Sequence, residues 1–200
     1  MPSLKRWTNI MPNNELFDRL IGKVLELGAT KSSVIDVKSI VFDPVFREIC
    51  ASNACGQYGK CWTCPPDAGD IDKLIAEAKG YSYALVYQTV SRLEDSFDFE
   101  GMIEAGNTHN RLAQEIRKAF SNADFSKALH LGAGGCRLCK VCAKKTNESC
   151  RHPELAMRSL EAYGIHVSKL AESAGMKYIN GQDTVTYFGA VLFSLNGEDR

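Results

Sequence analysis

The sequence lacks the features of an exported or membrane-embedded protein. Its first twenty residues contain no uninterrupted apolar stretch of the kind that secretory signals have. Its longest apolar runs, such as residues 189–193, are far too short to cross a bilayer. We therefore expect a cytoplasmic protein without a membrane span. Thiols stay reduced in that compartment, so we do not expect the eight cysteines to form a disulfide framework.

An excess of charge and the familiar cofactor motifs are also missing. Lysine and arginine together number 24, as do aspartate and glutamate, so we expect no general attraction to nucleic acid. Neither G-x-G-x-x-G nor a complete P-loop occurs, because residues 132–135 (GAGG) lack the G-K-[ST] ending. The C-x3-C-x2-C spacing of radical enzymes is absent too. The sequence therefore leaves open whether the protein is an enzyme.

The composition is sufficient for one ordinary domain. At 200 residues and 44% hydrophobic, the chain can bury a core without covalent crosslinks, and we expect a single domain over residues 1–200. The helical spacing of apolar residues predicts helices over 15–27, from 71 onward, through 112–120, over 153–163 and over 167–174. Branched and aromatic residues predict strands over 33–42, 81–90, 127–131 and 184–195.

These elements predict an α/β fold with a single sheet of about four strands and helices packed on it, with an α+β arrangement as the alternative. Residues 184–195 are apolar on both faces, which is typical of a central strand. The two cysteine-rich segments, residues 50–66 and 135–153, then form metal-binding loops at strand ends. Residues 65–135 contain no cysteine, so the two loops are well separated in the sequence.

The second loop has the more informative spacing. Its cysteines follow C-x2-C-x2-C-x7-C, at Cys136, Cys139, Cys142 and Cys150. Zinc sites usually draw their ligands from two separated pairs. Three cysteines at consecutive x2 intervals instead suit a body larger than one ion, as in the bacterial ferredoxin arrangement, although the last gap here is longer than in that arrangement. We predict a [4Fe-4S] cluster on these four cysteines, with zinc as the alternative.

The charges of the second loop support this prediction. Residues 136–151 contain five basic side chains and one acidic side chain, Glu148. Four thiolates on a four-iron core give a net negative complex, which nearby cations stabilise. His152 follows Cys150 by two positions and is placed to support or replace a ligand.

The first loop has a less regular pattern. Its cysteines follow C-x4-C-x5-C-x2-C, at Cys50, Cys55, Cys61 and Cys64, which fits no single template. Four cysteines in so short a segment can hold a second cluster or a zinc ion. We predict a second metal centre here, and the spacing leaves both metals open.

Several short motifs together resemble a known family. They are Cys50 and Cys55, Tyr58-Gly59-Lys60, Cys64-Pro65-Pro66, the Cys136–Cys150 set, Arg151 with Pro153, and residues 159–165. Over roughly residues 15–195 the chain resembles the uncharacterised prokaryotic family of predicted metal-binding proteins, domain of unknown function 2284. The resemblance implies metal binding and no particular reaction. Cys61 departs from the family pattern, which implies that three cysteines suffice at the first site and leave one metal position open.

The sequence as a whole predicts an intracellular iron–sulfur protein that acts in electron transfer. One [4Fe-4S] cluster lies on the second loop and a second metal centre, expected to be another cluster, on the first. Such a protein requires a redox partner protein, while its oligomeric state is not determined by the sequence. The alternatives are a zinc-stapled binding module, and a small redox enzyme that uses an open metal site or the Cys61–Cys64 pair.

Overall fold

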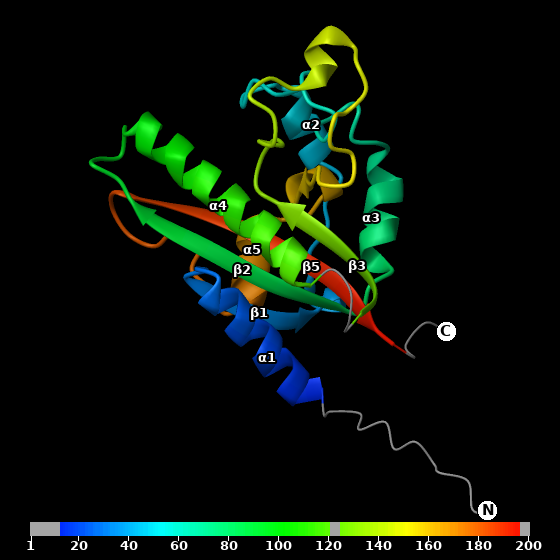
Figure 1. Cartoon of the computed structure of the whole chain (residues 1–200), viewed down its shortest axis with the longest axis vertical. Helices are drawn as coiled ribbons and strands as arrows, with labels where there is room; N and C mark the ends of the chain where they lie inside the picture. The colour runs from blue at the N-terminus through cyan, green and yellow to red at the C-terminus, as the bar shows by residue number, and fades with distance from the viewer. Residues whose placement is uncertain (1–12, 121–124, 197–200) are drawn as a thin grey trace, which may run out of the picture.

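One mixed sheet with helices on both faces organises the chain (Figure 1). The computed structural model describes residues 13–120 and 125–196. Within those ranges the strands are β1 (Lys31–Asp36), β2 (Tyr83–Arg92), β3 (Phe125–Gly132), β4 (Arg158–Ser159) and β5 (Thr184–Leu195). Their order is β1-β2-β5-β3-β4, and only the β3–β4 pair is parallel. The predicted α/β class is confirmed, with five strands in the described residues where about four were expected.

Two hydrophobic cores separate the sheet from its helices. On one face α1 (Asn13–Glu26) and α4 (Phe99–Ala119) pack against the sheet, with Leu20 and Ile116 buried beside Leu85. On the other face α3 (Ile71–Lys79) and α5 (Val167–Ser173) pack around Val86. Neighbouring residues of β2 enter opposite cores because side chains alternate along a strand. None of the described helices is long and apolar enough to cross a membrane.

Strand β5 occupies the centre of the sheet, as its sequence predicted. It pairs with β2 on one side and β3 on the other. Residues 188–194 are all buried, because both faces of this strand are covered by helices. The predicted range of 184–195 is confirmed.

The helix predicted over residues 153–163 is wrong. This segment forms turns, the short strand β4 and a 3-10 helix, η3 (Glu161–Tyr163). Its backbone pairs with the end of β3, where Leu131 lies opposite Arg158. The Leu160 N–H also donates to the Gly132 carbonyl over 3.1 Å. The backbone N–H and C=O groups of this segment form hydrogen bonds with the end of β3. In a helix they would have bonded to one another, but a short isolated helix is only marginally stable.

The strand predicted over residues 33–42 is shorter than expected. It ends at Asp36 and gives way to a 3-10 helix, η1 (Val37–Ser39). The side chains of Val37 and Ile40 are buried in the core beside α3 and α5. Their burial takes the place of further strand pairing between β1 and β2. The short helix α2 (Phe46–Ala51) was not predicted.

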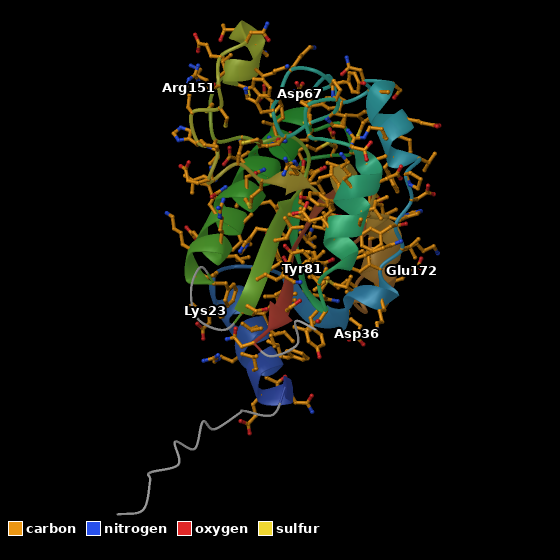
Figure 2. The ribbon with its side chains drawn as sticks, turned by 90° about the vertical axis from the view of Figure 1, so that its right-hand side faces the viewer. Lys23, Asp36, Asp67, Tyr81, Arg151 and Glu172 are labelled. Carbon is orange, nitrogen blue, oxygen red and sulfur yellow. The ribbon has the colours of Figure 1, made fainter. Side chains whose placement is uncertain are left out.

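Both cysteine-rich loops lie at the same end of the sheet. The second loop begins directly after β3, and the first follows α2 and leads into α3. Figure 1 shows these segments together at the top of the molecule, beyond the strand ends. Figure 2 places Asp67 of the first loop and Arg151 of the second at that same end. Segments that are distant in sequence are therefore neighbours in the fold.

Candidate metal centre

Turns and contacts within the second loop, rather than long helices or strands, determine its shape. Gly134 has a φ of 63°, a left-handed conformation that favours glycine, and it turns the chain out of β3. A 3-10 helix, η2 (Ala143–Thr146), follows Cys142. The Arg151 Nη1 donates to the Val141 carbonyl over 3.1 Å and closes the loop around its cysteines.

The first loop also folds through tight local turns. Cys50 lies on α2, and the chain then turns back so that the Tyr58 N–H donates to Asn53 Oδ1 over 3.1 Å. The Cys64 N–H donates to the Cys61 carbonyl over 3.0 Å, which makes one turn of the C-x2-C segment. The two thiols of this turn are in contact with each other, yet each lines a different cavity, as described below.

The two loops contact each other through backbone and side-chain hydrogen bonds. The Cys136 N–H donates to Thr63 Oγ1 over 3.3 Å, and Trp62 Nε1 donates to the Glu148 carbonyl over 3.0 Å. Lys144 Nζ lies 2.6 Å from Asp67 Oδ1 and 4.3 Å from the centre of the Trp62 ring. Both charged side chains of this pair are less than one-fifth exposed, so the pair is largely shielded from water. The loops therefore dock as one unit.

Five of the eight cysteines line a single cavity between the docked loops. Four come from the second loop, and the fifth is Cys61 of the first loop, whose side chain is almost fully buried. Trp62 and Ala143 close the cavity, and His152 also lines it. The cysteines of this cavity are Cys61, Cys136, Cys139, Cys142 and Cys150.

The remaining three cysteines line a second cavity. Cys50, Cys55 and Cys64 face a space of about 310 Å³ that is open on one side. A Cβ atom at Gly135 would lie 3.5 Å from the Cys64 sulfur, so the second loop forms part of this wall as well. The structure thus groups the cysteines as five and three, whereas the sequence arranges them as four and four.

Hydrogen bonds at the boundary between the cavities distinguish Cys61 from Cys64. A hydrogen bond shared with Cys64, the contact with the Thr63 hydroxyl at 3.3 Å and the nearby backbone amides hold the pKa of Cys61 well below its ordinary value, against the opposing effect of burial. The same hydrogen bond, together with burial and the neighbouring thiolates, raises the pKa of Cys64. Cys61 is therefore the first of the pair to become a thiolate, the form that binds metals.

Burial opposes ionisation of Cys136 and of Cys50. It raises the pKa of Cys136 to about 11, with smaller contributions from Cys61, Cys150 and Cys139. Burial also raises the pKa of Cys50, followed by Cys55 and Glu161. These mutual effects confirm that the thiols within each cavity are close neighbours. A bound cation would reverse them, because it stabilises thiolates directly.

The thiols surround cavities rather than a point. Among the residues in 13–120 and 125–196, no group of three or more His, Cys, Asp or Glu side chains is arranged to hold a single metal ion. Cys61 was grouped with the first loop in the sequence, and the structure places it with the second. Glu161, which lines the three-cysteine cavity, lies in the 159–165 stretch that contributes to the family resemblance, but sequence reasoning did not select it as a site residue.

Comparison with known proteins agrees with the cysteine pattern. The model of the predicted metal-binding protein family, domain of unknown function 2284, matches residues 33–193, which include both cysteine-rich loops. The chain belongs to this family. No curated protein and no solved structure matches it significantly. Metal binding is thus predicted for the family as a whole, and the matched range includes the residues that form the two cavities.

Proposed function

We propose that this member of the family is an iron–sulfur protein that transfers electrons to a partner protein. Cys136, Cys139, Cys142 and Cys150 would hold one [4Fe-4S] cluster, and Cys50, Cys55 and Cys64 would hold a second metal centre. The observation that carries the proposal is the gathering of five thiols around one cavity. A cubane takes one thiolate at each of four corners, so its ligands surround a body, whereas zinc ligands converge on one ion.

The surroundings of the five-cysteine cavity suit a negatively charged cluster. Such a cluster would supply a one-electron redox couple when bound. Trp62 and Ala143 form part of the cavity wall, and Lys144, a largely buried positive charge, lies over the Trp62 ring. The backbone of Thr63 and Cys136 lies beside the Cys61 sulfur and lowers its pKa, as amide donors near a thiolate do.

The hydrogen bond between Cys61 and Cys64 supports a relay between two centres. Cys61 lines one cavity and Cys64 the other, and Thr63 lines both, so the two cavities are adjacent. Centres held in these cavities would be neighbours. A protein with two adjacent centres can accept an electron at one and release it from the other.

The partner is expected to present an acidic surface. We define the basic rim as Lys60, Lys140 and Lys145, three exposed lysines beside the cavities for which the described residues provide no ion-pair partner. The whole chain carries no net charge, so this local excess is not a general property of the protein. Electrostatic complementarity would orient an acidic redox partner toward this end of the molecule.

The first test is metal analysis of protein purified without oxygen. Iron, zinc and acid-labile sulfide are measured on the sample that gives the visible spectrum, and electron paramagnetic resonance is recorded before and after dithionite. We expect a brown protein with about eight iron and eight sulfide per chain for two cubanes, or about four of each for one. A colourless zinc protein would refute the proposal and leave a zinc-stapled binding module. A metal centre that does not respond to dithionite would refute electron transfer.

Variants assign each centre to its loop. Cys139→Ser should remove the iron of the five-cysteine cavity, and Cys55→Ser should remove only the metal of the three-cysteine cavity. Ser149→Ala is the matched control, because Ser149 is an exposed residue of the same loop as Cys139. Loss of all metal in both cysteine variants would contradict two separate centres.

One observation favours a small redox enzyme as the second candidate. The three-cysteine cavity is larger than the metal site alone requires, and it opens to solvent on one side. If it serves catalysis, Cys64→Ser abolishes turnover of a substrate and leaves the cluster of the second loop intact. Retention of full turnover by that variant would exclude this candidate.

A further inference from the structure

The wall opposite the three cysteines is mainly apolar. Phe46 and Ile49 of α2 lie on one side, and Tyr58, Pro65 and Ala162 complete it. At about 310 Å³, the space is at the lower end of the range for small-molecule sites. Apolar walls of this kind contribute affinity by removing apolar ligand surface from water.

The charged side chains of this cavity are all acidic. Among its lining residues in the described part of the chain, there is no lysine, arginine or histidine. Glu161 supplies the single carboxyl group, and Ser159 lines the cavity beside it. Arg47 lies outside the lining, where its Nη2 is directed to the Ala162 carbonyl 3.5 Å away, although its charge does act on the Cys50 thiol. With Glu161 as the only charged lining residue in the described part of the chain, the wall itself offers no cation to an anionic ligand.

Glu161 lies close to the three-cysteine site without belonging to either cysteine motif. Glu161 and Cys50 both line the cavity, so the carboxyl group lies on the wall of the space that the cysteines also face. The carboxyl group is therefore placed where a ligand in this space would contact it.

We propose that the three-cysteine cavity binds a small, uncharged and largely apolar molecule, which places an electron-pair donor atom toward the metal and a hydrogen-bond donor toward Glu161. This inference rests on the proposed function, because three cysteines leave one metal position open. Glu161 is a positioning residue for the ligand rather than a fourth metal ligand. The cavity therefore selects against anions of similar size.

The test uses the metal-loaded protein and two probes that differ in charge. tert-Butyl isocyanide is neutral and apolar, whereas azide is an anion, and both bind iron that has an open position. We expect the isocyanide to change the electron paramagnetic resonance signal of the reduced protein in a saturable manner, and azide to leave it unchanged. A protein that contains iron but responds to neither probe, or responds to azide equally well, would overturn the inference and leave the proposed function standing.

A metal-independent measurement covers the case in which no iron is found. Ligand-observed nuclear magnetic resonance compares benzyl alcohol with benzoate, which share a ring and differ in charge. We expect binding of the alcohol only. Equal binding of the two, or binding of neither, refutes the charge selection whatever metal is present, whereas absence of iron alone refutes the proposed function.

Three variants complete the design. Ile49→Glu puts a charge at the exposed edge of the cavity and should weaken binding of the neutral probes by about fivefold or more, equivalent to about 1 kcal/mol. Ile179→Glu is the matched control, since Ile179 is even more exposed and lines none of the cavities described above. Glu161→Gln should keep the full metal content and alter probe affinity. Loss of metal in Glu161→Gln would make Glu161 a ligand, close the site and overturn the inference.

Discussion

The pair of Lys144 and Asp67 should control how firmly the two cysteine-rich loops hold together. Replacing Lys144 by methionine keeps the length of the side chain and removes its charge. Asp67 would then remain largely buried beside no cation, and its Oδ2 already has no hydrogen-bond partner among the described residues. The variant should therefore weaken the docking of the two loops. The sheet should be unaffected, because neither residue belongs to the hydrophobic cores that pack against it.

The magnitude follows from the burial of the pair. Exposed ion pairs contribute about 0–1 kcal/mol, whereas breaking a fully buried pair costs about 3–5 kcal/mol. Both side chains here are less than one-fifth exposed, which places the loss between these limits. The contact of Lys144 with the Trp62 ring adds about 0.5–2 kcal/mol. We expect docking to weaken by about 3 kcal/mol, or roughly a hundredfold in the opening equilibrium.

Hydrogen exchange detected by mass spectrometry measures this opening. Amides in residues 57–69 and 136–150 should exchange faster in Lys144→Met, while those in β2 and β5 should not change. Lys145→Met is the matched control, because the neighbouring lysine is exposed and makes no ion pair with described residues. Adding Asp67→Leu to Lys144→Met should restore part of the protection, since no buried carboxylate then lacks a partner. If Lys144→Met exchanges like Lys145→Met, the docking role of this pair is refuted.

Three further predictions concern acid stability, the partner surface and Cys61. Burial lowers the pKa of His109 to about 4, below its unfolded value of about 6.5, so stability is complete above pH 6.5 and falls as the pH drops toward 4. Between pH 7 and pH 5, His109 should lower the free energy of unfolding by about 2 kcal/mol. Urea unfolding should show this loss in the parent protein and not in His109→Gln. An equal loss in both proteins would contradict the prediction. Reversing charge at the basic rim with Lys140→Glu and Lys145→Glu should slow reduction by an acidic flavoprotein at low salt but not at high salt, and an unchanged rate at low salt would rule out this docking surface. Cys61→Ser should preserve the metal content of the three-cysteine cavity, because the Cys61 thiol faces the other cavity. Elemental analysis can check this. Loss of that metal would show that Cys61 is one of its ligands.

The regular elements with strong patterns could be predicted from the sequence. Residues 184–195 place apolar side chains on both faces, and such a segment is most stable between two covered faces, so both its length and its central position were predictable. The helix predicted from residue 71 onward does begin there, because the Asp70 side chain caps it by accepting a hydrogen bond from the Lys73 N–H. The helix prediction for residues 153–163 was wrong because this segment pairs with the end of β3. That partner is distant in sequence, so no local pattern indicates it.

The sequence by itself determined that eight cysteines occupy two loops and that the chain belongs with predicted metal-binding proteins. The spacing of residues along a chain limits which side chains can reach one another within a loop. The cysteine spacing therefore identified one group of four cysteines in each loop. Only the tertiary structure decided that Cys61 joins the four cysteines of the second loop and that Glu161 faces the other three. These placements depend on how two loops dock across the end of a sheet, through contacts such as Lys144–Asp67. A docking contact joins residues far apart in sequence, and no local spacing records it.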